Sequence, residues 1–441
     1  AIRLSVILDS EHSLELIVMI DSGKPQAVRM GTVLVTSIFL SLACGYFLSF
    51  LYRSINAMIA PQLVDSLGLS PSELGLVTAI YFFSFGLFQF PLGILLDCFG
   101  PARVQSSLLV IAALGALLFS QGESFGALTL GRGLIGLGVS GALMSSFTAF
   151  ALWFSHRHLP LINGCFLGFG GLGALAATKP VEWALELTDW RGLFLILSAA
   201  SLFVAVLVAV CLPKTKVEGD AFGWRNQFSD LAKIYCSRLF WRTAPLAGMS
   251  IATGLSVQGL WAGTWLRDVA HFQPGAIATH LSLIAVGLTV GPMLSGVVAS
   301  AVHRRGLSMM SLLGGIAVVF MGIQAMIIFE FISLSYFLWF GFGLLMNAMA
   351  LAYAILAQAF PPALAGRVTT NLNFLMIGIA FASQYLVGLL IEFWPQTQDG
   401  GYAPEAYQVG FGVLLGAQIL AFIWFVIARH DTVDGGKSPV R

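Results

Sequence analysis

The sequence predicts an all-α integral membrane protein with twelve transmembrane helices in two pseudo-symmetric six-helix bundles. Of its 441 residues, 58% are hydrophobic and 10% are charged, and the mean hydropathy is +0.88. Soluble domains carry about 25% charged residues, so this composition fits a chain surrounded by lipid. A membrane helix needs about 20 mostly apolar residues, and the length of the chain accommodates twelve. The first half of the chain also resembles the second.

Apolar runs bounded by Gly, Pro or charged residues place six expected helices in each half. The first six are 32–60, 73–96, 103–120, 126–154, 161–183 and 192–212. The second six are 243–265, 276–300, 307–328, 334–358, 368–394 and 407–428. The expected organisation is an N-terminal tail over 1–31, a first bundle over 32–212, a polar linker over 213–242, a second bundle over 243–428 and a C-terminal tail over 429–441.

Residues 1–29 differ from both a signal peptide and a membrane span. They begin with Ala1, place acidic residues around the apolar stretch LELIVMI, and lack a basic start and a small-residue cleavage site. Met30 stands directly before the first long apolar run. We therefore interpret this segment as a cytoplasmic tail or as the product of an upstream start.

An internal repeat relates the two halves. Segment 61–96 aligns without gaps with segment 264–299, which puts Asp65 over Asp268 and Gly93 over Gly296. The chain is therefore interpreted as a duplicated membrane protein.

Positive charge is distributed unevenly between the two ends of the expected helices. With the amino terminus inside, the outer loops hold only Arg191 and Arg267, and the spans hold only Arg53, Arg132 and Lys179. All the others of the 22 Lys and Arg residues fall on the cytoplasmic side. Since cytoplasmic loops are enriched in Lys and Arg, both termini are expected in the cytoplasm.

The composition excludes several function classes. A net charge of +1 provides no basic face for nucleic acid. The five cysteines show no CxxC and no metal-ligand spacing, so no metal site is expected. The stretch GRGLIG (131–136) matches GxGxxG, but it lies within an apolar helix without a preceding strand. We interpret its glycines as helix-packing positions and expect no cofactor.

The most informative motif is GILLDCFGPAR, residues 93–103, directly behind the second expected helix. Gly93 permits close helix approach, and Gly100 with the following proline forms a turn. Asp97 offers an anion to a neighbouring helix amino terminus or to Arg103.

This pattern resembles the G-x-x-x-D-x-x-G-x-x-R loop of the major facilitator superfamily. Arg132 with Gly136, and the stretch WRGLF at 190–194, also resemble features of that family. The resemblance covers residues 32–430. It implies that Gly93, Asp97, Gly100 and Arg103 form a conformational latch.

The downstream copy of the latch lacks the acid. Ser300 stands where the carboxylate would be, before Arg304 and Arg305. The expected latch is therefore asymmetric, with its carboxylate from the first half alone. The alternative is that the turn only anchors helix ends at the membrane interface.

Arg53 is the sharpest candidate for binding a solute. It stands well inside the first expected helix, where an arginine facing lipid costs about 2.5–3.5 kcal/mol, so we expect it to face the bundle or water. The spacing of Arg53 to Pro61 resembles the first helix of the organic-phosphate and anion exchangers of the superfamily. The resemblance implies that this guanidinium binds phosphate or carboxylate. Alternatively, Arg53 reaches the outer interface or bonds carbonyl groups structurally.

The resemblance to those exchangers is incomplete. They use a second arginine in the seventh helix, where this chain has none, and the repeat places Ser256 opposite Arg53. A monocarboxylate or a polar zwitterion is therefore expected in preference to a doubly charged phosphate. Apart from Glu182, no acid stands well inside an expected span, so the cavity should attract anions and disfavour lipophilic cations.

Polar and aromatic side chains from other helices complete the candidate site. The predicted substrate-binding residues are Arg53, Asn56, Gln89, Gln258, Trp261, Asn347, Tyr353 and Gln384. Each of the uncharged polar ones could instead serve helix packing, and Trp261 could instead belong to the outer aromatic belt. Arg132 is assigned a structural or coupling role.

We therefore expect a secondary transporter of a small organic solute, anionic or zwitterionic, that works by alternating access. Its expected partners are the lipid bilayer, the solute and a co-transported or exchanged ion, and we expect a monomer in a bacterial inner membrane. An exporter of drugs or metabolites, or a solute receptor with the transporter fold, are the alternatives. No constellation of His, Cys and acids meets within the spans, so no enzyme is expected.

Overall fold

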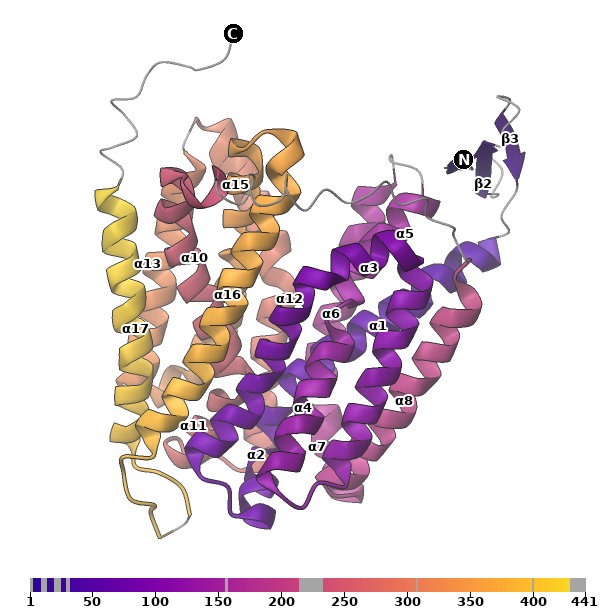
Figure 1. Ribbon diagram of the computed structural model, residues 1–441. Helices are drawn as coiled ribbons and strands as arrows, with labels where there is room; N and C mark the ends of the chain where they lie inside the picture. The colour runs from indigo at the N-terminus through magenta and orange to yellow at the C-terminus, as the bar shows by residue number, and fades with distance from the viewer. Residues whose placement is uncertain are drawn as a thin grey trace. The chain divides into compact units, whose positions relative to one another are not determined.

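The computed structural model describes residues 3–8, 14–19, 25–28, 32–154, 158–213, 233–306, 308–398 and 400–428. By its internal contacts the chain forms two compact units (Figure 1). The first consists of Ala1–Ile55 and Phe83–Phe222, and the second of Asn56–Phe82 and Gly223–Arg441. Most of the expected linker, and the expected C-terminal tail, lie outside the described residues.

The first unit begins with a small antiparallel sheet. Its strands are β1 (Arg3–Leu8), β2 (Leu14–Met19) and β3 (Pro25–Val28), in the order β1-β2-β3. No strands were predicted in this tail from the sequence. The sequence signal for them was a set of short apolar, β-branched stretches separated by Asp, Ser and Gly.

The rest of the first unit is helical over the residues that the structure describes. Its helices are α1 (Thr32–Ser54), the part of α3 from Phe83 to Ser120, α4 (Phe125–Val139), α5 (Ala142–Trp153), α6 (Leu159–Ala176), α7 (Lys179–Leu187) and α8 (Trp190–Cys211). α1 is the central helix, since it packs against α4, α5, α6 and α8. Asp189 caps α8 by accepting a hydrogen bond from the Gly192 N–H at 2.9 Å, as the N-cap position favours.

Glycines allow close backbone contacts in the first unit. A Cβ added at Gly131 would lie 2.8 Å from the backbone nitrogen of Phe119, and one added at Gly173 would clash with the carbonyl of Phe47. The interpretation of GRGLIG as a helix-packing stretch is therefore confirmed at Gly131.

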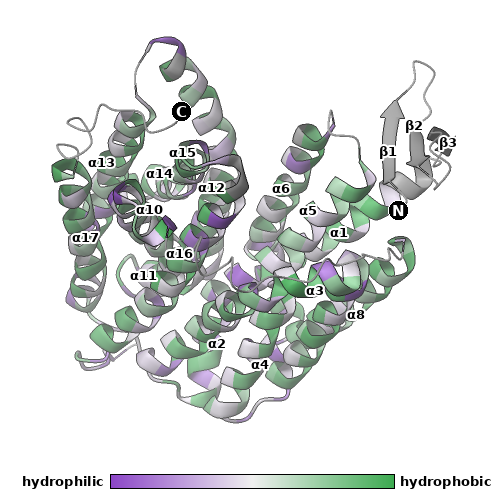
Figure 2. Ribbon diagram, turned by 45° about the horizontal axis from the view of Figure 1, so that its top comes forward, coloured by the Kyte–Doolittle hydropathy of each residue, from purple (hydrophilic) through white to green (hydrophobic). Residues whose placement is uncertain are grey.

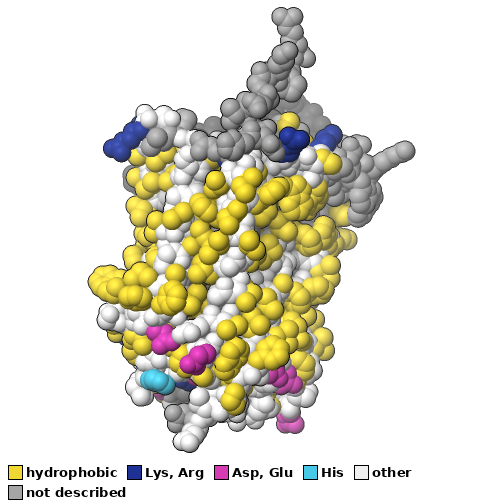
Figure 3. Space-filling view, turned by 90° about the vertical axis from the view of Figure 1, so that its left-hand side faces the viewer, with side chains coloured by type: hydrophobic (Ala, Val, Ile, Leu, Met, Phe, Trp, Pro, Cys, Tyr) yellow, Lys and Arg dark blue, Asp and Glu magenta, His cyan; other side chains and the backbone are white. Residues whose placement is uncertain are grey.

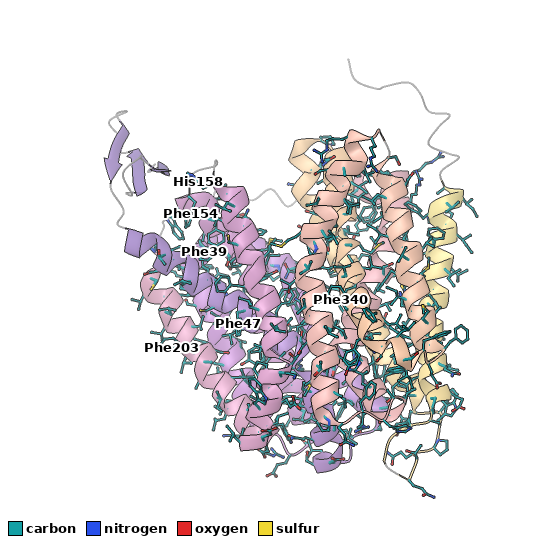
Figure 4. The ribbon with its side chains drawn as sticks, turned by 180° about the vertical axis from the view of Figure 1, so that it is seen from behind. Phe39, Phe47, Phe154, His158, Phe203 and Phe340 are labelled. Atoms are coloured by element: carbon teal, nitrogen blue, oxygen red, sulfur yellow. The ribbon has the colours of Figure 1, made fainter. Side chains whose placement is uncertain are left out.

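Aromatic rings fill the space beside α1. Phe39, labelled in Figure 4, lies 5.9 Å from the Phe150 ring and 5.8 Å from the Phe169 ring, measured between centroids. By contrast, Phe203 on α8 is 68% exposed. Ring packing thus joins α1 to α5 and α6, while apolar side chains remain on the outer surface of α8.

The second unit is helical in its described part. It contains α2 (Asn56–Leu67), the part of α3 from Pro71 to Phe82, α10 (Arg238–Ser256), the π-helix η1 (Val257–Trp261), α11 (Ala262–Asp268), α12 (Pro274–Arg304), α13 (Met309–Ile328), the 3₁₀ turn η2 (Ile332–Leu334), α14 (Ser335–Ala348), α15 (Leu351–Ala359), α16 (Pro362–Ile391) and α17 (Pro404–Ile427). α10 packs against α16 and α17, and α12 packs along α14.

Among the described residues, nine helices are long and apolar enough to cross a membrane, or ten when the bent pair α6–α7 counts as one span. α3 has 50 residues and is non-helical at Gly100, so it contains two of the expected helices. The less apolar α10, η1 and α11 form another. Together these elements correspond to the twelve expected helices.

The helix surfaces carry the apolar side chains that a lipid environment requires. Green dominates the helices in Figure 2, where hydropathy is coloured. Figure 3 shows one face on which apolar side chains form a broad surface, with Lys and Arg at one end and Asp and Glu towards the other. Leu420 on α17 is 69% exposed. In a helix, backbone polar groups are paired internally, so such a surface suits hydrocarbon.

Candidate functional site

The predicted ligand residues are divided between the two units. Arg53 and Gln89 belong to the first unit, and the other six belong to the second: Asn56, Gln258, Trp261, Asn347, Tyr353 and Gln384. The set thus draws on both units.

The first expected helix is interrupted between Arg53 and Asn56. The prediction of one helix over 32–60 was wrong here, because α1 ends at Ser54 and α2 begins at Asn56. Pro61 lies within α2, and a proline ring conflicts with the carbonyl four residues earlier, here that of Ala57. The backbone at Gly263 packs against this same carbonyl.

Arg53 lies in the last turn of α1, between two aromatic rings. Its guanidinium carbon is 4.7 Å from the centre of the Phe50 ring and 5.2 Å from that of Phe85. Both the rings and the helix C-terminus favour a positive charge. Among the described residues no carboxylate forms an ion pair with Arg53, and its buried Nε has no hydrogen-bond partner. The guanidinium is therefore positioned by apolar rings and not neutralised by an acid.

Arg132 is fully buried directly beside this region. Its Nη2 donates a hydrogen bond of 2.6 Å to the backbone carbonyl of Tyr52, the residue before Arg53. The hydroxyl of Tyr52 in turn lies 2.9 Å from Oγ of Ser201. These bonds link α4, α1 and α8, which fits the structural half of the role assigned to Arg132.

Asn56 and Gln89 each bond within their own unit. Nδ2 of Asn56 donates to Oγ1 of Thr78 at 2.8 Å, and Nε2 of Gln89 donates to the carbonyl of Ser140 at 3.1 Å. Asn56 is completely buried, and its Oδ1 has no hydrogen-bond partner among the described residues. Both amides therefore connect neighbouring segments, and Asn56 keeps an unused acceptor.

Asn347 and Tyr353 likewise have neighbours within the second unit. Nδ2 of Asn347 donates to the carbonyl of Leu288 at 2.9 Å, and the hydroxyl of Tyr353 donates to Oδ1 of Asn373 at 3.2 Å. These bonds join α14 to α12 and α15 to α16.

The π-helix η1 contains Gln258 and Trp261, and Trp261 contacts Gln384. Gln258 and Trp261 are part of η1 and are 5% and 1% exposed. The indole N–H of Trp261 donates to the backbone carbonyl of Gln384 on α16 at 3.1 Å. Of the predicted ligand residues, Trp261 and Gln384 are brought into direct contact.

The latch residues lie around the break in α3. Gly100 has φ 76° and ψ 163°, which ends one helical segment and starts the next, as a glycine permits. Asp97 and Arg103 are exposed, and no ion pair between them is recorded in the described part of the chain. A Cβ added at Gly93 would meet no atom within 4 Å, so the first unit shows no close helix approach there.

One buried carboxylate, that of Asp268, was not predicted from the sequence. Asp268 was assigned to an outer loop, but α11 continues to this residue, and its side chain is 2% exposed. Oδ1 accepts from Nε of Arg267 at 2.6 Å, and Oδ2 accepts from the hydroxyl of Tyr407 at 2.6 Å and from the N–H of Tyr402 at 3.2 Å. The acid thus ties α11 to α17 and to the loop before it.

The loop before α17 is built closely around Asp268. A Cβ added at Gly401 would lie 2.7 Å from Oδ1 of Asp268, and Gly400 has φ 72°. A small pocket adjoins this cluster within the second unit and is lined by Asp268, Tyr402 and Tyr407. The signal in the sequence was the pair of glycines together with an acid that the repeat aligns with Asp65.

The described residues contain no group of three or more His, Cys, Asp or Glu side chains that could hold a metal ion. The cysteines are all unpaired. Among the histidines whose burial the structure describes, His280 is the most buried, and it is bonded to the carbonyl of Ala276 and to Ser335.

Residues 42–384 match the family model of the Major Facilitator Superfamily. The chain is 26% identical to the probable sulfoacetate transporter SauU of Cupriavidus necator over 298 residues, 64% of this chain and 69% of that protein. It is also 26% identical to the hexuronate transporter of Escherichia coli K12, over 37% of this chain and only 38% of that protein. The fold is similar to that of a bacterial homologue of the lysosomal transporter Spinster, with TM-score 0.77, 13% identity and coverage of 93% of this chain and all of the other.

Proposed function

Because the chain belongs to the Major Facilitator Superfamily, we propose that it is a secondary transporter for a small organic anion of the carboxylate class. It is a multi-pass membrane transporter of a small molecule and not an enzyme. The solute is proposed to move by alternating access of two halves around a central site.

Arg53 carries the proposal for an anion. Its guanidinium is held between Phe50 and Phe85 without a described acid to neutralise it. A guanidinium binds carboxylate or sulfonate through a fork of N–H donors. The similar proteins from Cupriavidus necator and Escherichia coli are named for sulfoacetate and hexuronate, which are both organic anions.

A ligand screen tests this function. The purified protein would be heated with sulfoacetate, glucuronate, glycerol 3-phosphate, glycine or tetraphenylphosphonium, and uptake of each stabilising solute into proteoliposomes would follow. We expect one of the two carboxylates to raise the melting temperature and to be transported. Stabilisation and transport of the lipophilic cation alone would contradict the proposal and support a drug exporter.

We further propose the organisation and setting of the transporter. The two six-helix bundles are assigned to 32–212 and 243–428, joined by a cytoplasmic linker over 213–242. The uneven distribution of Lys and Arg supports cytoplasmic termini. The two relatives named above are transporters of the bacteria Cupriavidus necator and Escherichia coli, which supports a bacterial inner membrane. We propose a monomer in that membrane, coupled to a co-transported or exchanged ion.

The proposed latch predicts unequal effects in the two halves. Asp97→Asn should lower the initial uptake rate at least tenfold, because it removes the carboxylate that would bind a helix amino terminus or Arg103. Ser300→Ala should stay within twofold of the unmodified protein, because the second copy has no acid. Initial rates in proteoliposomes measure both. Since Asp97 is exposed, its variant should keep its melting temperature, and equal losses in the two variants would refute an asymmetric latch.

A further inference from the structure

The π-helix η1 gives Gln384 a second interpretation. π-Helical turns are rare in proteins, and those that occur often lie at functional sites. In η1 the N–H of Ala262 donates to the carbonyl of Val257, five residues earlier. The turn therefore holds one residue more than a regular α-helical turn, and it carries Gln258 and Trp261, two of the predicted ligand residues.

Gln384 is bonded to both ends of this turn. Oriented by its surroundings, its amide nitrogen lies 3.0 Å from the carbonyl oxygen of Ser256, the residue before η1. Its amide oxygen then lies 3.1 Å from Nε1 of Trp261, the last residue of η1, and shares the indole N–H with the backbone carbonyl of Gln384. A carbonyl oxygen has two lone pairs, so Ser256 can accept this bond besides a main-chain one. Gln384 is completely buried, and both ends of its amide are used within the protein.

Neighbouring backbone keeps this arrangement in place. A Cβ added at Gly75 would lie 3.1 Å from the carbonyl oxygen of Gln384 and 3.3 Å from Cζ2 of Trp261. After the turn, Gly263 packs against the carbonyl of Ala57, and Asp268 is bonded to α17. With the helix after the turn held in this way, the extra residue is accommodated inside η1.

We propose that Gln384 is a positioning residue that maintains the π-turn and thereby directs Gln258 and Trp261, in place of the solute-binding role expected from its polarity. One residue of an α-helix turns by about 100°, so conversion of η1 to a regular helix would redirect the side chains of the turn. The expected effect of the turn on transport rests on the proposed function. The stabilisation of the turn by Gln384 does not depend on that function.

Deletion of Gly259 tests that link through stability. The deletion removes the extra residue, so η1 can become a regular helix while both flanks keep their register. Gln384→Leu should lower the melting temperature by about 3 °C in the otherwise unmodified protein, because it removes the bond to Ser256 and leaves the Trp261 N–H with the backbone carbonyl alone. In the deletion variant the same substitution should lower the melting temperature by less than half as much.

Gln418→Leu is the matched control. Gln418 is also completely buried, and its bonds are to the side chains of Thr253, one turn before η1, and of Gln324, with none recorded to a residue of η1. Its substitution should lower the melting temperature equally with and without Gly259. If Gln384→Leu lowers the melting temperature equally with and without Gly259, the proposal is overturned. If the deletion variant does not fold, the pair Gln384→Leu and Trp261→Phe should be non-additive, and additive costs would overturn the proposal.

Uptake of sulfoacetate and glucuronate by proteoliposomes is the second measurement. Gln384→Leu and the Gly259 deletion should each lower Vmax/KM at least tenfold, and their combination should be no lower than the deletion alone. Losses that multiply in the combination would identify Gln384 as an independent solute ligand. If the unmodified protein carries neither solute, the proposed function fails, whereas the stability comparison still decides the role of Gln384.

Discussion

Replacement of Arg53 by alanine should lower uptake of the organic anion at least a hundredfold, and replacement by lysine should leave a measurable part of it. A charge-assisted hydrogen bond contributes about 1.5–3 kcal/mol, and a guanidinium fork supplies two such bonds to one carboxylate. Lysine keeps the charge but loses the fork. Initial uptake rates in proteoliposomes, measured across a range of solute concentrations, check both variants.

The alanine variant at Arg53 should remain folded, because the buried Nε has no hydrogen-bond partner in the described structure. Its lost ring contacts with Phe50 and Phe85 should cost only about 1 kcal/mol. Arg305→Ala is the control for loss of a positive charge, since Arg305 is exposed and should transport normally. Normal uptake by Arg53→Ala would exclude a role of this arginine in binding the solute.

Replacement of Asp268 by alanine should lower the free energy of unfolding of the second unit by about 3 kcal/mol. The change leaves Arg267, the Tyr407 hydroxyl and the Tyr402 N–H without the acceptor that they share. Buried donors that lose their partner cost about 1–3 kcal/mol each, and Arg267 recovers part of this because its side chain is 29% exposed. Denaturation of the purified protein, followed by tryptophan fluorescence, measures the loss.

Asp65→Ala is the matched control for Asp268→Ala. The repeat aligns the two acids, but Asp65 is exposed, so its substitution should change the free energy of unfolding by less than about 0.5 kcal/mol. Comparable losses from both variants would show that the bonds of Asp268 do not stabilise the second unit.

Much of the helical architecture could be predicted from hydropathy. Apolar runs located every expected helix, because the need to bury backbone polar groups in lipid acts on each segment separately. The helix boundary between Arg53 and Asn56 could not be predicted from hydropathy. The break between them lies before Pro61 and before Ala57, whose carbonyl packs against Gly263, and this packing is a contact between segments far apart in the sequence.

The candidate site was predicted unevenly. Arg53 stood out because a charge in an apolar run is costly wherever it faces lipid. Gln384 was selected by polarity alone, and the sequence contains no sign that its amide meets Ser256 and Trp261 across the space between α16 and η1. Asp268 was placed in a loop, since the apolar run before it ends at Trp265.

The sequence by itself determined that this chain crosses a membrane repeatedly, that its halves are related, and that a lone arginine lies in its first helix. These properties follow from local composition and spacing. The tertiary structure decided which polar side chains are used within the protein, because a hydrogen bond depends on distance and direction and not on residue type. Thus Asp65 and Asp268 align in the repeat, but only Asp268 is buried among three donors.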